Sequence, residues 1–197
     1  MKKAMLLSAT AILFLLISCK KEDSPSENIL DGKTTEFLVN GNQRAGNYTL
    51  FSFEQGKEVP SSDSNSSKWD FGIRFETFII NSASSGPGNA YVQIANTPFN
   101  EITTGALPGY KRDTSATQRA IKGSEWYTYN STTRVLSPIS GKTFLFVTAN
   151  SKYAKMEILR ADPADDNGNP VIPPTRPTKI KYTLRYFYQK NGTPNFQ

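Results

Sequence analysis

Histidine is absent from the sequence, and cysteine occurs only once in 197 residues, as Cys19. Without histidine, and with no thiol in the predicted domain, the chain cannot assemble a Ser-His-Asp triad, a Cys-His pair or a usual zinc site. A single cysteine also excludes an intrachain disulfide. These absences remove most hydrolytic and zinc-dependent chemistries, so we expect a binding protein and not an enzyme.

Paired carboxylates are the catalytic arrangement that the composition still permits, because glycoside hydrolysis needs only two acidic side chains. Two of the candidates, Asp70 and Glu76, fall on the polar face of a predicted strand, where solvated surface carboxylates are the ordinary explanation. We therefore keep glycosidase activity only as an alternative. The acidic residues that could converge are Asp70, Glu76, Glu101, Glu125 and Glu157.

Basic residues outnumber acidic residues only slightly. The chain has 23 basic and 17 acidic residues, a formal charge of +6. Removal of Lys2 and Lys3 with the N-terminal segment leaves 21 against 17, or +4. The basic residues are scattered, so the electrostatic footprint of a nucleic-acid-binding face is missing. At this length, with 37% hydrophobic residues, we expect one domain with one core.

Long apolar runs are missing except at the N-terminus. Two lysines precede an almost wholly apolar run from Ala4 to Ile17, and Ser18 then precedes Cys19. This pattern predicts a secretory signal peptide over 1–18, with Cys19 as the residue that is lipidated. Several acyl chains on one residue would hold the protein on a membrane without crossing it. We expect residues 19–34 to form a flexible spacer and 35–197 to form the folded domain.

The strongest strand signal is the stretch from Trp69 to Asn81. Its large apolar residues alternate with polar ones, which predicts a half-buried strand at the centre of the core. The inward-facing set is Trp69, Phe71, Ile73 and Phe75, and the outward-facing set is Asp70, Gly72, Arg74 and Glu76.

Further strands are predicted wherever alternating or β-favouring residues lie between turn formers. No stretch after the signal peptide has a helical period, so we expect an all-β domain of antiparallel sheets with long loops forming a ligand cleft. Met156 alternates with Ala154 and Ile158, which indicates a core position. The segment 96–122 reads as a long loop, and 162–177 as a solvated acidic loop. The other predicted strands are 36–39, 48–53, 91–95, 126–129, 144–148, 153–159 and 179–189.

Several segments resemble the HmuY family of haem-binding lipoproteins in residue pattern and order. They are Tyr48–Val59, Lys68–Phe75, Asn81 with Ser85–Gly88, Lys152–Ile158 and Tyr182–Tyr186. The resemblance implies a β-rich surface lipoprotein of the outer membrane that binds haem in a cleft between its sheets and loops. It also implies delivery of the haem to a TonB-dependent outer-membrane receptor.

The sequence differs from this family at the positions that are expected to ligate the haem iron. The resemblance implies two axial ligands, histidine or methionine, one of them after an aromatic run similar to Trp126–Tyr129. Asn130 and Ser131 occupy that place here, and neither is a usual haem ligand. Tyrosine can ligate ferric haem, although aromatic packing is the ordinary role for such residues. The candidates for the haem cleft are Tyr110, Trp126, Tyr127 and Tyr129.

Basic residues in the same loop region could pair with the haem propionates, or could simply be solvated. They are Lys111, Arg112, Arg119 and Lys122. Two alternatives to haem capture remain open. One is a divergent protein that lacks iron ligation and binds another planar or apolar ligand, or a glycan, in the same cleft. The other is a purely structural surface lipoprotein.

Overall fold

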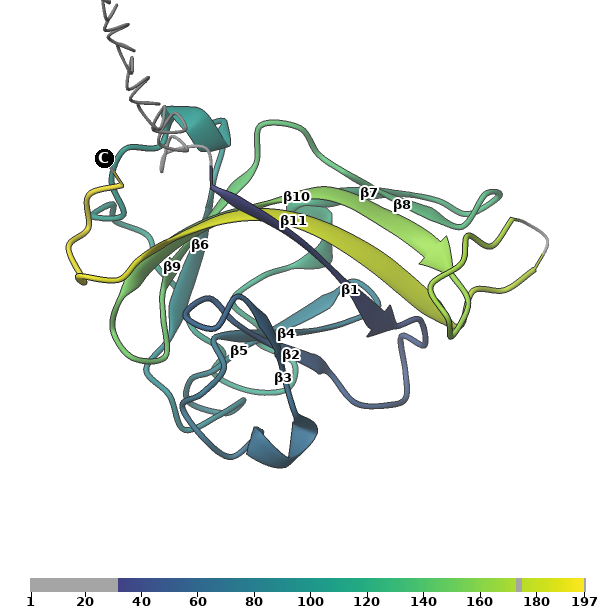
Figure 1. Ribbon diagram of the computed structural model, residues 1–197, viewed down its shortest axis with the longest axis horizontal. Coiled ribbons are helices and arrows are strands. Elements are labelled where there is room, and N and C mark those ends of the chain that lie inside the picture. Colours follow the sequence, from purple (N-terminus) through teal and green to yellow (C-terminus); the bar gives the residue numbers. More distant parts are fainter. Residues whose placement is uncertain (1–31, 173–174, 197) are drawn as a thin grey trace, which may run out of the picture.

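The computed structural model describes residues 32–172 and 175–196 (Figure 1). The predicted signal peptide, Cys19 and most of the predicted spacer lie outside these ranges. Within them the regular structure consists of strands and three-residue 3-10 helices, which confirms the all-β prediction. None of the described helices has the length and apolar character that a membrane crossing needs.

The larger sheet has five antiparallel strands in the order β1-β11-β10-β9-β6. The predicted strands 91–95 and 179–189 are confirmed with these bounds. β10 is longer than predicted, so Asp162 lies in the sheet opposite Lys181 and not in a solvated loop. The strands are β1 (Lys33–Asn40), β11 (Lys179–Gln189), β10 (Tyr153–Ala164), β9 (Thr143–Val147) and β6 (Tyr91–Ala95).

The smaller sheet has four strands in the order β3-β2-β4-β5. They are β3 (Lys57–Val59), β2 (Thr49–Ser52), β4 (Phe71–Arg74) and β5 (Thr77–Ile80). The prediction of one strand from Trp69 to Asn81 is therefore wrong, because the chain reverses at Phe75 and pairs Ile73 with Phe78. Phe75 has φ 52°, a left-handed conformation that aromatic residues rarely adopt. No glycine or asparagine marks this turn, so local turn signals could not reveal it.

A third, two-stranded sheet is the hairpin β7 (Tyr127–Asn130) and β8 (Val135–Pro138). β8, like β3, is a short strand without a clear alternating pattern, and neither was predicted. Short 3-10 helices punctuate the connections between strands. They are η2 (Ser61–Asp63), η3 (Phe99–Glu101) and η4 (Gly123–Glu125).

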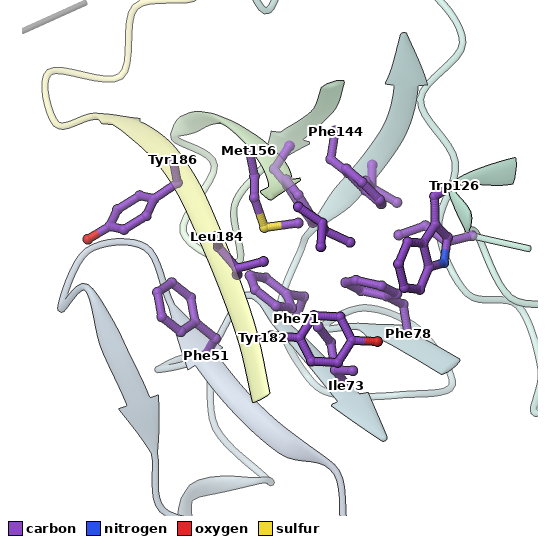
Figure 2. Close-up of a cluster of buried hydrophobic side chains, with 14 of the residues drawn as sticks. Phe51, Phe71, Ile73, Phe78, Trp126, Phe144, Met156, Tyr182, Leu184 and Tyr186 are labelled. Carbon is purple, nitrogen blue, oxygen red and sulfur yellow. The ribbon is translucent and has the colours of Figure 1, made fainter. Parts of the chain in front are cut away.

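The core lies between the two larger sheets and is rich in aromatic rings (Figure 2). Phe71 of β4 contacts Phe51 of β2 at 5.2 Å between ring centroids and Phe146 of β9 at 5.6 Å, so it joins the sheets. Met156 is completely buried in this cluster, as predicted. Trp69 belongs to a separate cluster with Leu50, Val59 and Ile79, not to the face of Phe71.

Asp70 is buried between the sheets, which contradicts the prediction of a solvated surface carboxylate. Its two carboxylate oxygens accept hydrogen bonds from the backbone N–H groups of Phe53, at 2.8 Å, and Ala149, at 2.9 Å. Burial raises the pKa of Asp70 to about 6, although both hydrogen bonds act in the opposite direction. Asp70 therefore connects two segments that are distant in sequence.

Candidate functional site

A cavity of about 1040 Å³ lies where four chain reversals meet. The β1–β2 loop, the β4–β5 turn, the β7–β8 hairpin and the β10–β11 connection each contribute to its wall. In Figure 1 the tip of the hairpin and the β10–β11 connection lie at the same end of the molecule. The volume is at the upper end of the range that is usual for small-molecule sites. The lining residues are 40–44, Phe75, Glu76, Tyr127, Tyr129, Arg134, Asp166 and 176–179.

Backbone hydrogen bonds hold three of these reversals together. The N–H of Gly41 donates to the carbonyl of Thr178 at 2.9 Å, which ties the β1–β2 loop to the β10–β11 connection. The N–H of Phe75 donates to the carbonyl of Asn40 at 2.8 Å. The Tyr182 hydroxyl, buried in β11, donates to the carbonyl of Phe75 at 2.6 Å. These contacts stabilise the unusual backbone conformation of Phe75 and hold this residue at the cavity.

Aromatic side chains form the apolar part of the wall. The ring of Phe75 meets that of Tyr129 edge to face, with 6.4 Å between centroids. Tyr129 is 47% exposed, so its ring is available to a ligand. Tyr127 is half-buried, and burial, with smaller contributions from Glu76 and Tyr129, raises its pKa. A neutral phenol is thus favoured at Tyr127 in the free protein.

Positive charge dominates the rim of the cavity. Lys179 lies 3.9 Å from the Asp166 carboxylate. The other cations of the rim are Arg44, Arg134 and Arg176, and they form no ion pair with any residue in the described ranges. Unpaired guanidinium groups beside aromatic faces can hold a planar ligand with carboxylates at its edge.

The structure brings only two of the four aromatic candidates to this cavity, Tyr127 and Tyr129. Trp126 is buried in the core, where its ring lies 4.7 Å from that of Tyr127 and 5.6 Å from that of Phe78 (Figure 2). Tyr110 packs in a different cluster, and its hydroxyl donates to the carbonyl of Gly105 at 2.9 Å. Burial raises the pKa of Tyr110 to about 12.

The four basic candidates gather in another hollow, of about 700 Å³, that shares no lining residue with the cavity. Lys111 lies 4.0 Å from Glu125. The guanidinium of Arg112 lies 5.7 Å from the ring centroid of Tyr91. The residues of this hollow that were predicted to pair with propionates are Lys111, Arg112, Arg119 and Lys122.

Arg119 already has a partner within the protein. Its Nη1 lies 3.2 Å from Oδ2 of Asp113, which is completely buried. Asp113 also accepts hydrogen bonds from the backbone N–H groups of Ile80, at 3.0 Å, and Ala120, at 2.8 Å, and from the Ser85 hydroxyl, at 2.6 Å. This buried carboxylate therefore fixes its own loop, 96–122, to the end of β5 at the edge of the smaller sheet.

The described cavity lining contains no histidine, methionine or cysteine, so tyrosine is the one usual type of haem ligand in it. Met156 is in the core, and the Oδ1 of Asn130 accepts hydrogen bonds at 3.0 Å from the N–H groups of Thr132 and Thr133, which shapes the hairpin turn. In the described part of the chain, no three acidic residues converge as a metal site. In the acidic loop, Asp165 instead accepts the N–H of Asn169 at 2.8 Å.

Sequence reasoning missed six residues that line the cavity, four of them cationic. These are Gln43, Arg44, Phe75, Arg134, Arg176 and Lys179. They occupy turns and strand ends, where no periodic pattern distinguishes them. The turn signal at Asn40-Gly41 was the available clue, because it places the β1–β2 loop at one end of the sheet.

Comparison with known proteins places the fold. No family model and no curated protein matches this chain. Among solved structures, the apo HmuY analogue of Tannerella forsythia aligns with a TM-score of 0.50 and 13% identity, over 81% of this chain and 100% of that chain. Apo PinO from "Porphyromonas gingivitis" aligns with a TM-score of 0.46 and 14% identity, over 79% and 97%. The chain thus has the HmuY-like all-β fold.

Proposed function

We propose that this protein is a lipid-anchored haem-binding protein of the cell surface that captures haem and passes it to a TonB-dependent outer-membrane receptor. The observation that carries the proposal is the cavity of about 1040 Å³, which combines aromatic side chains with unpaired cations on an HmuY-like fold. Phe75 and Tyr129 offer apolar contact for a porphyrin face, and the guanidinium groups of Arg44 and Arg134 suit its propionates.

The cavity lining suits contacts with the porphyrin ring and its propionates better than it suits ligation of the iron. Haem iron is held in proteins by histidine, cysteine, methionine or tyrosine side chains, and only tyrosine lines this cavity. The raised pKa of Tyr127 opposes formation of its phenolate. We therefore expect the iron to gain at most one phenolate or a water, with weaker binding than two protein ligands would give.

Removal of two rim cations is expected to weaken haem binding. The double variant Arg44→Ala with Arg134→Ala should raise the Kd for ferric haem about a hundredfold or more, because each of the two lost charge-assisted contacts is worth about 1.5–3 kcal/mol. Absorbance titration of the purified protein measures this, and the ferric spectrum should be high-spin. The matched control is Arg112→Ala with Lys122→Ala, which removes two cations from the other hollow and should leave the Kd unchanged.

If only the control pair loses binding, the haem propionates bind in the second hollow and not in the cavity. Tyr127→Phe and Tyr129→Phe, made singly, separate ligation from packing, since only the hydroxyl is lost. The one that ligates iron would lose a charge-transfer band, whereas Tyr110→Phe should change nothing. A sharp low-spin spectrum that vanishes in Met156→Leu would contradict the assignment of Met156 to the core.

A second candidate function is capture of a planar anionic ligand without iron. The observation that favours it is the absence of histidine, methionine and cysteine from the cavity lining. Iron-free protoporphyrin IX distinguishes the two candidates. If it binds as tightly as ferric haem, the porphyrin and not the metal is recognised. If neither binds, a glycan ligand or a structural role becomes the better account.

The membrane anchor is tested at Cys19, the only thiol of the chain. Cys19→Ala is expected to release the protein from the membrane fraction, because an acylated cysteine is the proposed anchor and no other residue could carry it. Cell fractionation followed by a high-salt wash measures this, with Ser18→Ala as the control that keeps the thiol. Persistence of the Cys19→Ala protein on washed membranes would refute the anchor.

A further inference from the structure

Glu76 is the buried carboxylic acid of the cavity wall. It follows Phe75 in the β4–β5 turn and is only 7% exposed, although sequence alternation placed it on a solvated face. Buried acidic residues are normally paired with a cation or fully hydrogen-bonded. Glu76 meets neither condition.

The hydrogen bonds of Glu76 are incomplete. The Nε2 of Gln43 donates to its Oε1, whereas its Oε2 is buried without a hydrogen-bond partner among the described residues. The neighbouring Tyr182 hydroxyl is engaged with the carbonyl of Phe75 and so cannot donate to it. The Oε2 of Glu76 therefore needs either a hydrogen-bond donor or a proton of its own.

The charged groups around Glu76 do not neutralise it. Arg74 lies nearest in sequence, but its Nη1 donates to the carbonyl of Gly46 at 3.2 Å and its guanidinium lies 4.6 Å from the ring centroid of Tyr48. The phenol of Tyr127 faces it from β7. Burial raises the pKa of Glu76. The backbone N–H of Glu76 itself, the hydrogen bond from Gln43 and the charge of Arg74 offset this only in part. The remaining charged groups of the cavity are Arg44, Arg134, Asp166, Arg176 and Lys179.

We propose that Glu76 sets the charge selectivity of the cavity, because an anionic ligand binds there together with a proton that Glu76 takes up. The inference rests on the proposed function only in requiring an anionic ligand. An ionised Glu76 repels the carboxylates of a ligand that enters the cavity, whereas the protonated form does not. Linkage then requires that the ligand binds more tightly as the pH falls.

The predicted pH dependence belongs to Glu76 among the residues that line the cavity. Asp70 and Lys155, whose pKa values are about 6 and about 8, do not line it. Between about pH 8.5 and pH 6, arginine and lysine stay protonated and ordinary carboxylates stay ionised. Tyr127 stays neutral because its pKa is raised. The affinity should therefore rise as the pH falls, because the negative charge of a bound ligand raises the pKa of Glu76 further.

The experiment titrates the full mature domain with iron-free protoporphyrin IX, which removes iron chemistry from the measurement. Quenching of Trp126, whose ring lies 4.7 Å from that of Tyr127, reports binding. Glu76→Gln should bind with the tight, low-pH affinity of the wild type at every pH. Asp166→Asn is the matched control, because it removes an exposed carboxylate of the same cavity and should keep the pH dependence. Gln43→Ala should move the pH midpoint upward, since the loss of its hydrogen bond raises the pKa of Glu76.

The outcomes separate this inference from the proposed function. If the wild type binds equally at all pH values, or if Glu76→Gln keeps the wild-type slope, the proton link is wrong while porphyrin binding stands. If no variant binds porphyrin at any pH, the proposed function and this inference fail together. The Gln43→Ala result stands in for Glu76→Gln if thermal unfolding shows that Glu76→Gln does not fold.

Discussion

Replacing Phe71 with alanine is expected to lower the free energy of unfolding by about 3–5 kcal/mol, the usual cost of removing a large aromatic side chain from a core. Phe71 is completely buried. Its ring contacts that of Phe78 in β5 at 5.8 Å and that of Phe53, the residue directly after β2, at 5.3 Å. It also contacts Phe146 of the larger sheet at 5.6 Å. The loss therefore weakens packing within and between the sheets (Figure 2).

Chemical denaturation followed by tryptophan fluorescence measures this change through the midpoint and the slope. Leu159→Ala is the control, because Leu159 is 43% exposed on β10 and its truncation should cost less than about 0.5 kcal/mol. A Phe71→Ala variant with the wild-type midpoint would mean that the interface between the two sheets is not the main source of stability.

Replacing Asp113 with alanine is expected to cost about 3–5 kcal/mol, because breaking a buried ion pair leaves its partner unpaired. The variant would leave Arg119 without its carboxylate. It would also remove the acceptor for the N–H groups of Ile80 and Ala120, which are buried in the protein. The loop 96–122, which Asp113 fixes to the end of β5, should loosen before the rest of the domain unfolds.

Amide hydrogen exchange shows where Asp113→Ala acts, and denaturation gives its size. The control is Asp63→Ala, which removes the aspartate of another ion pair, one that lies at the surface. Asp63 pairs with Lys68 at 3.0 Å, but the side chain of Lys68 is 59% exposed, so the loss should stay below about 1 kcal/mol. Equal effects of the two variants would show that burial does not strengthen the Asp113 pair.

The strand positions were largely predictable because the alternation of side chains across a strand is a local property. β6 and β11 have the predicted bounds, and Met156 lies in the core, as its alternation with Ala154 and Ile158 indicated. The alternation gave a wrong prediction at one place, the stretch from Trp69 to Asn81, and tertiary contacts explain why. From Trp69 to Glu76 it runs unbroken through a chain reversal at Phe75, whose left-handed backbone depends on contacts with Asn40 and Tyr182.

The candidate site was only partly predictable. Of the predicted site residues, Tyr127 and Tyr129 line the cavity, whereas Trp126, Tyr110 and the four basic residues lie elsewhere. Proximity along the chain suggested that these residues share one cleft. The hairpin β7–β8 separates them, because it carries the two tyrosines to the end of the molecule where the β10–β11 connection lies.

By itself, the sequence determined the all-β class, the apolar core positions and the lack of histidine or thiol ligands, since composition and a two-residue period do not depend on distant contacts. Only the tertiary structure decided which polar residues are buried. Asp70 accepts a hydrogen bond from Ala149, 79 residues away, and Tyr182 donates to Phe75 across 107 residues. Such distant contacts bury a carboxyl group and shape a cavity. The residues that exclude water from the carboxyl group come from other parts of the chain, so a local sequence pattern does not reveal them.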